Sequence, residues 1–297
     1  MRKHSIPKAL VKLYVMIVIC FVLLIWTFWG NTALTVNNVK ISSSRIPAAF
    51  SEFRIAQVSD LHNAEFGKGN KELLELLSES KPDIIVITGD LVDAKHTDIG
   101  VALDFAKEAV NIAPVYYVTG NHEASLLQYR ELKTGLETIG VVVLEDEAIQ
   151  LRRDKEAVTL IGLFDPNSTL KDDIFGETPA MVNTKLNSLA DDESSYTILL
   201  SHRPELFESY AHCNIDLVLS GHAHGGQFRL PFIGGLIAPD QGIFPKYDAG
   251  LFTNGSTNMI VSRGLGNSII PIRFNNPPEI IVIELLNTDL SDQFIEN

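Results

Sequence analysis

Cysteine is scarce in this chain of 297 residues, which has only Cys20 and Cys213. Cys20 lies inside a long apolar run, so a single cysteine is left for the rest of the chain. One cysteine forms no internal disulfide, and this excludes the class of small exported proteins that a disulfide framework stabilises. The sequence also lacks internal repeats, low-complexity segments and any clear boundary between domains, so we expect one domain after the apolar run.

Positive charge is scarce as well. The chain has 24 Lys and Arg residues against 37 Asp and Glu residues, which gives a formal net charge of −13. Four cations, Arg2, Lys3, Lys8 and Lys12, precede the apolar run, and without them the net charge is −17. Proteins that bind nucleic acid rely on Lys and Arg to contact the phosphate backbone. We therefore expect no nucleic-acid partner.

The one long apolar run, LYVMIVICFVLLIWTFWG, covers residues 13–30. Its length is close to the ~20 residues that cross a bilayer, and Trp26 and Trp29 near its end are typical interfacial residues. The alternative is a cleaved signal peptide, whose apolar core is usually ~7–15 residues and for which GNTALT is a poor cleavage site. By the positive-inside rule, we expect residues 1–30 to form a cytoplasmic tip and a single-pass anchor in the cell membrane. The rest of the chain would then lie on the extracytoplasmic side.

A segment expected to be a short tether, residues 31–50, leads into a region where apolar runs alternate with amphipathic stretches. Runs typical of buried strands cover residues 53–62, 82–93, 114–123, 158–166, 196–204, 215–224, 259–266 and 279–286. Helix-like segments cover residues 71–80, 99–110, 126–139 and 204–210. Buried strands separated by helices indicate a layered α/β domain, which we expect over residues 51–297.

Polar side chains stand where five of these apolar runs end, namely Asp60 and His62; Asp90; Asn121, His122 and Glu123; His202 and Arg203; and His222 and His224. The carboxyl ends of strands in an α/β sheet open onto the ligand crevice, so we expect these side chains along one edge. Residues two apart on an extended strand point to the same face. Asp60 and His62 can therefore reach one point, and His222 and His224 can too, if each strand remains extended there.

Each of these patterns alone is a weak signal, because a single strand-end His or a Gly-Asp pair usually has a structural explanation. Their joint occurrence is harder to explain without a ligand. A cluster of unpaired carboxylates and imidazoles is costly to bury, and a bound cation removes that cost. Carboxylate and imidazole together suit Mn, Fe or Zn better than Mg or Ca.

The motifs at these strand ends, taken together, resemble those of the calcineurin-like metallophosphoesterase superfamily over residues 53–285. In chain order they are D-x-H, G-D, G-N-H-E, a single strand-end His and G-H-x-H. The segments GHAHGGQFRLPFIGG, GIFPKYDAGLF, SRGLG and NPPEIIVIEL resemble a membrane-anchored bacterial branch of it. The resemblance implies a two-layer β-sandwich flanked by helices, preceded here by one N-terminal transmembrane helix. It also implies two divalent metal ions at one edge of the sandwich.

The resemblance also assigns roles. One metal would be held by Asp60, His62, Asp90 and His224, and the second by Asp90, Asn121, His202 and His222, with Asp90 as the bridge. His122 would approach the phosphate and the leaving group, so His122 and Asp90 are the expected catalytic residues. Glu123 either orients His122 or faces solvent, and we favour solvent. Arg203 either binds phosphate or pairs with an acid, and Asp165 is a weaker candidate for a contact with the ligands.

The function that the resemblance implies is hydrolysis of a phosphodiester or pyrophosphate bond by a metal-bound hydroxide. A membrane anchor favours a lipid-linked substrate, such as a phospholipid or a UDP-diacylglucosamine-like nucleotide. The loop over residues 225–252 either packs as an ordinary loop or contacts lipid. Two other functions remain open: another metal hydrolase such as an amidase, which Asp90 with Asn121 argues against, and a non-catalytic metal-containing scaffold, which His122 argues against.

Overall fold

Two six-stranded sheets build the domain in a computed structural model that describes residues 7–166, 178–190, 195–267 and 270–293. The first sheet has the order β1 (Thr35–Ser43), β16 (Glu279–Asn287), β2 (Arg54–Val58), β3 (Ile84–Thr88), β4 (Val115–Val118) and β5 (Val142–Val143). The second has the order β14 (Gly250–Asn254), β15 (Thr257–Val261), β9 (Leu217–Ser220), β8 (Tyr196–Leu200), β7 (Glu156–Gly162) and β6 (Glu147–Arg153). The predicted sandwich and all of its predicted strands are confirmed.

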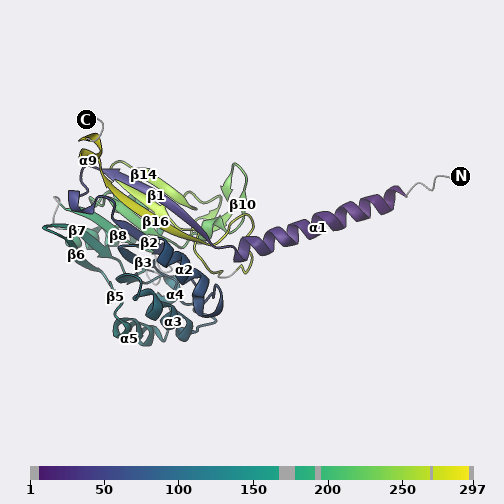
Figure 1. Cartoon of the computed structure of the whole chain (residues 1–297), viewed down its shortest axis with the longest axis horizontal. Coiled ribbons are helices and arrows are strands. Elements are labelled where there is room, and N and C mark those ends of the chain that lie inside the picture. The colour runs from purple at the N-terminus through teal and green to yellow at the C-terminus, as the bar shows by residue number, and fades with distance from the viewer. Residues whose placement is uncertain (1–6, 167–177, 191–194, 268–269, 294–297) are drawn as a thin grey trace.

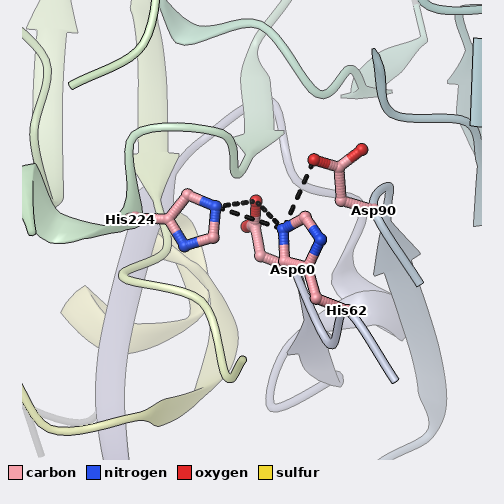
Figure 2. Close-up of side chains that lie close together, drawn as sticks. All are labelled: Asp60, His62, Asp90 and His224. Carbon is pink, nitrogen blue, oxygen red and sulfur yellow. Dashed lines mark hydrogen bonds and ion pairs between the residues drawn. The ribbon is translucent and has the colours of Figure 1, made fainter. Parts of the chain in front are cut away.

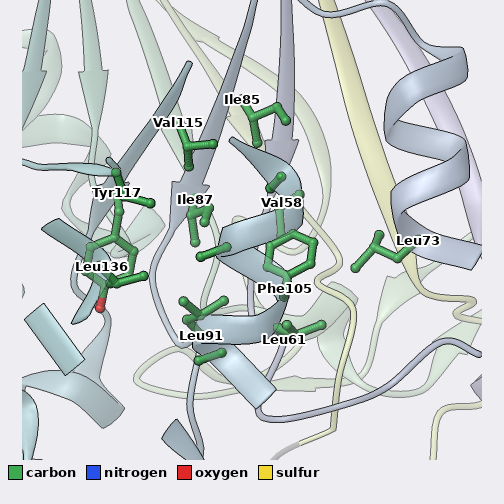
Figure 3. Packing of buried hydrophobic residues seen from close by; sticks show 14 of the residues in the cluster. Val58, Leu61, Leu73, Ile85, Ile87, Leu91, Phe105, Val115, Tyr117 and Leu136 are labelled. Atoms are coloured by element: carbon green, nitrogen blue, oxygen red, sulfur yellow. The ribbon is translucent and has the colours of Figure 1, made fainter. Parts of the chain in front are cut away.

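The strands are buried on both faces, which explains their unbroken apolar sequences. In β3, Val86 faces the second sheet, whereas Ile85 and Ile87 face the helices outside the first sheet. Phe105 of α3 (Ile99–Ala109) is fully buried there and lies close to Ile87 (Figure 3). Truncating such a phenylalanine typically costs ~3–5 kcal/mol of stability, so these contacts hold the helices firmly on the sheet.

Helices cover both outer faces. The first sheet is covered by α2 (Lys71–Glu79), α3 and α5 (Tyr129–Ile139), and the second by α7 (Thr178–Leu189) and α8 (Phe207–Ala211). The sequence did not predict α7, and α5 begins three residues later than predicted. The predicted helix 204–210 is instead a 3-10 turn, η3 (Pro204–Leu206), followed by α8. The whole is a four-layer arrangement of helices, sheet, sheet and helices.

Residues 31–50 do not form the tether that we expected. Within them, β1 pairs in parallel with β16 over nine residue pairs, from Thr35 with Glu279 to Ser43 with Asn287. The strand was missed because it lies at the edge of its sheet and is mostly polar and partly exposed, so its sequence, TVNNVKISS, has no long apolar run. The N-terminal helix therefore leads almost directly into the first sheet.

That helix, α1 (Lys8–Thr32), projects away from the domain (Figure 1). By length and composition it is the one helix among the described residues able to cross a membrane. Its C-terminal end is fastened to the domain: Gly30 is buried, and the Asn31 side chain donates to the backbone oxygen of Arg273 (3.1 Å) and accepts from its N–H (2.9 Å). Arg2 and Lys3 of the expected cytoplasmic tip lie outside the described residues.

Candidate metal centre

The predicted ligands lie in the turns that follow five strands, at one edge of the sandwich. Three of these strands, β2, β3 and β4, belong to the first sheet, and β8 and β9 belong to the second. The turns supply Asp60 and His62, Asp90, Asn121, His202, and His222 and His224, in that order. The site therefore exists only where the two sheets face each other, and it joins side chains far apart in sequence, such as Asp60 and His222, which are separated by 162 residues.

The backbone at these ligands is not extended. Asp60, His62, Asp90, His222 and His224 have φ values of 53°, 46°, 51°, 67° and 46°, so each lies in the left-handed region. The condition that the strands remain extended through the D-x-H and H-x-H pairs is therefore not met, because β2 ends at Val58 and β9 at Ser220. Non-glycine residues rarely adopt this conformation, and such strain is concentrated at functional sites.

Two glycines allow these turns to approach one another. A Cβ atom on Gly221 would lie 1.9 Å from Oγ of Ser59 and 2.5 Å from Oδ2 of Asp60. A Cβ atom on Gly120 would lie 2.2 Å from Oδ1 of Asp90. The glycines of the G-N-H-E and G-H-x-H motifs are thus needed because carboxylates occupy the space that a side chain would fill.

The first group of ligands consists of Asp60, His62, Asp90 and His224, all buried, each with one ligand atom within 4.8 Å of the others (Figure 2). The Nε2 atoms of His62 and His224 are 3.2 Å apart. His62 Nε2 is 3.5 Å from Oδ2 of Asp90, and His224 Nε2 is 3.4 Å from Oδ1 of Asp60. Two imidazole nitrogens and two carboxylates directed at one point form a donor set suited to a divalent transition metal.

The second group consists of Asp90, His202 and His222, again with ligand atoms within 4.8 Å of one another. Asp90 belongs to both groups, which is the position that a bridging ligand requires. Nε2 of His202 and Oδ1 of Asn121 are buried and have no hydrogen-bond partner among the described residues. A buried polar atom without a partner is costly, so both atoms fit a bound cation. Six of the seven predicted residues thus come together in these two groups, Asn121 has a buried side-chain oxygen that fits the same role, and the roles of all seven as ligands remain a prediction.

The two groups differ electrostatically. Burial lowers the pKa of His62 to about 4 and that of His224 to about 3, despite the nearby carboxylates. Burial also opposes a charge on His202, but the nearby charge of Asp90 raises the pKa of His202 to about 10. At neutral pH the first group therefore offers free imidazole nitrogens, whereas a metal at the second group competes with a proton on His202.

Glu123 does not face solvent as we expected. Its side chain is buried and accepts hydrogen bonds from the backbone N–H groups of Asp90 (2.9 Å), Val92 (3.0 Å) and Gly120 (2.8 Å). Burial and the charge of Asp90 raise the pKa of Glu123 to about 7, although the backbone donors oppose this. The carboxylate therefore fastens the turn that carries Asp90 to the turn that carries Asn121.

His122 lies beside the first group, and its side chain is only 12% exposed. Its ring is 4.5 Å from the ring of His62. Its Nδ1 accepts a hydrogen bond from the Ala94 N–H (2.9 Å), so a neutral ring carries its proton on Nε2, which is 4.0 Å from Oδ2 of Asp90. Asp93, which the sequence reasoning missed, is 3.7 Å from Nδ1 of His122 and 3.9 Å from Nδ1 of His62. Its only sequence signal is its place three residues after Asp90.

Arg203 pairs with acids rather than lying free for phosphate. Its guanidinium is buried and contacts Asp165 through Nε (2.7 Å) and Nη2 (3.1 Å), so Asp165 is held against the residue that follows His202. Asp240, which had no sequence signal, contacts both Arg203 and Nε2 of His222 (2.9 Å). Nη1 of Arg203 is also 3.0 Å from Nε2 of His222, so Asp240 and Arg203 together hold the ring of this histidine in place.

Comparisons with known proteins agree with this geometry. The family model described as calcineurin-like phosphoesterase matches residues 53–226. An uncharacterized metallophosphoesterase of Bacillus subtilis, YkuE, is 32% identical over 255 residues, which cover 84% of this chain and 84% of the relative. The phosphodiesterase YaeI of Escherichia coli is 27% identical over 239 residues, covering 79% of this chain and 82% of the relative.

Among solved structures, TT1561 of Thermus thermophilus has a TM-score of 0.50 at 14% identity. The match covers 72% of this chain and 91% of that chain. At this identity the likeness concerns the fold alone, and it agrees with the paired sheets described above.

Proposed function

This chain belongs to the calcineurin-like phosphoesterase family, whose members use divalent metals, and from that premise we propose a specific reaction for it. It is a metal-dependent phosphoric ester hydrolase. The proposal is that two divalent ions, Mn, Fe or Zn, take part in hydrolysis of a phosphodiester or pyrophosphate bond. The observation that carries it is Asp90, which belongs to both groups of ligands at the edge of the sandwich.

The residues of the chain divide the work between binding and proton transfer. Two ions in such a site supply positive charge for the phosphoryl oxygens and an activated water for attack on phosphorus. Asp90 sets the spacing between the groups, and Glu123 and Asp240 hold Asp90 and His222 in place. Nε2 of His122 carries a proton toward the same space, so His122 can donate it to a phosphoryl or leaving-group oxygen.

A diester is favoured over other substrates by the phosphodiesterase YaeI, which shares most of its length with this chain. We further propose that the substrate is lipid-linked, such as a phospholipid or a UDP-diacylglucosamine-like nucleotide. Support comes from α1, which has the length and composition of a membrane span and is fastened to the ligand edge through Asn31. The proposed enzyme is a single-pass protein of the cell membrane with its metal centre on the extracytoplasmic side. Membership of this family sets aside an amidase, and the presence of His122 with the whole ligand set argues against a scaffold.

The test uses the full chain purified in detergent, loaded separately with Mn, Fe and Zn. Hydrolysis of bis(p-nitrophenyl) phosphate is compared with that of p-nitrophenyl phosphate, and a phospholipid and a diacylglucosamine nucleotide are then presented in vesicles. We expect metal-dependent cleavage of the diester above that of the monoester, and cleavage of at least one lipid substrate. An enzyme that cleaves only the monoester would overturn the proposed bond, and one that ignores both lipids would overturn the proposed substrate class.

A further inference from the structure

Two short hairpins follow the last metal ligands and display apolar side chains. β10 (Arg229–Leu230) pairs with β11 (Gly234–Gly235), and β12 (Ile237–Ala238) pairs with β13 (Gly242–Ile243). Phe232, at the tip of the first hairpin, is fully exposed at 109%, and Ile233 beside it is 62% exposed. Ile243 and Phe244 are also exposed, at 69% and 60%. Large apolar side chains gathered at hairpin tips commonly mark a binding surface.

The backbone at these tips makes the exposure harder to explain within the folded chain. Phe232 has a φ of 67° and Phe244 a φ of 56°, and a bulky residue in the left-handed region is an outlier. Glycine or asparagine would adopt this conformation at lower cost. A phenylalanine usually offsets such strain by burying its ring, but the ring of Phe232 lies wholly in solvent. An apolar environment outside the chain would offset this cost.

The first hairpin lies next to the end of α1. Asn31 is hydrogen-bonded to the backbone of Arg273, and the next residue, Phe274, forms a bridge with Phe228 and accepts a hydrogen bond from the N–H of Arg229 (3.0 Å). One extended segment thus separates the end of α1 from the start of β10. Figure 1 shows the hairpin and α1 on the same side of the domain.

This side is also the ligand edge. Nη2 of Arg273 is 3.4 Å from Nδ1 of His224. The hairpin is packed backbone to backbone on the turn that carries this ligand, because a Cβ atom on Gly226 would lie 2.3 Å from Cα of Gly235. The hairpin and the metal centre therefore have a fixed relative position, and both lie at the root of α1.

We infer that the tip of the first hairpin, Phe232 with Ile233, inserts into the bilayer surface beside α1 as a second membrane contact. The inference rests on the proposed membrane anchoring of α1 and extends it. A bilayer is favoured over a soluble partner because the hairpin is joined, through Arg273 and Phe274, to the end of a helix of membrane-spanning composition. The segment 228–238 has no acidic residue, and its one cation, Arg229, is paired with Asp248 (2.8 Å). Two contacts at the root of α1 restrict the tilt of the domain and turn its metal edge toward lipid head groups.

The test measures the lipid exposure of single labelled positions in the full chain, reconstituted in vesicles of phosphatidylethanolamine and phosphatidylglycerol. Cys20→Ser and Cys213→Ala remove the native thiols, and Phe232→Cys carries an environment-sensitive fluorophore. The matched control is Lys155→Cys, at an exposed position in the turn between β6 and β7. This turn lies at the edge opposite the ligands, because it precedes β7, which runs parallel to β8, and the ligand His202 follows the end of β8. A third protein keeps Cys20 as its only labelled thiol and reports whether α1 is in the bilayer.

We expect a blue shift of emission and quenching by doxyl lipid at positions 20 and 232, with neither at position 155. Quenching at position 20 alone would overturn the second contact while leaving the anchor intact. No quenching at any position would overturn the anchor and the inference with it. A blue shift at position 232 that is insensitive to doxyl lipid and grows with protein density would show that a second copy covers the tip, and would also overturn the inference.

Discussion

Replacing Glu123 with alanine removes the carboxylate that joins two ligand turns. The change leaves the backbone N–H groups of Asp90, Val92 and Gly120 buried without their acceptor. Each unsatisfied buried donor costs about 1–3 kcal/mol, so the three together cost roughly 3–6 kcal/mol if the turns relax in part. That loss is a large share of the ~5–15 kcal/mol that stabilises a typical domain.

The loss should also reach the metal centre, because the freed turns carry Asp90 and Asn121. We expect Glu123→Ala to lower the midpoint of urea unfolding, to bind metal more weakly and to lose diesterase activity. Glu123→Gln should be milder, since its amide oxygen can still accept from part of this set. Glu131→Ala, at an exposed position on α5, is the matched control.

The assays are urea unfolding in chelator, metal content after gel filtration and kcat/KM for bis(p-nitrophenyl) phosphate. Unfolding in chelator separates the backbone effect from stabilisation by bound metal. A Glu123→Ala protein as stable as the control, with full metal content and activity, would refute the role of the carboxylate as a clamp.

Four further predictions concern the ligands and the topology. Asp90→Asn should lose turnover and bind both metals more weakly, whereas Asp104→Asn, on the exposed face of α3, should do neither. An Asp90→Asn protein that retains two metals would refute the role of Asp90 as the bridging ligand. His122→Ala should keep its metals but lower kcat about 10²–10⁴-fold, with a smaller loss for substrates that release nitrophenol. Unchanged turnover would show that His122 has no catalytic role. The affinity for the second metal should rise with pH across the neutral range, because His202, with a pKa of about 10, must release a proton before it binds a metal. Calorimetric titrations of metal at three pH values measure this affinity, and an affinity that does not change with pH would contradict the prediction. Protease added to spheroplasts should digest the domain, and full protection would reverse the predicted topology.

Most of the element types followed from local sequence. Buried strands such as β3 and β8 have short β-branched runs, and α2 and α3 have apolar residues at helical spacing, so neighbouring residues alone identified them. The edge strand β1 was missed because its stability comes from hydrogen bonds to β16, whose residues are about 240 positions away in the chain. A strand that depends on its partner more than on its own apolar residues leaves little trace in the sequence.

The grouping of the candidate ligands could also be predicted, because metal coordination demands particular residue types and the strand ends place them in a fixed order. The sequence by itself thus determined the fold class, the family and the residues able to hold metal. Only the tertiary structure decided how they meet: Asp60 and His222 turn into the left-handed region, Glu123 is buried against three N–H groups, and Asp240 reaches His222 from a later hairpin. These features depend on how two sheets pack across their common edge. Packing of this kind joins residues distant in the chain, whereas sequence patterns report chiefly on residues that are neighbours.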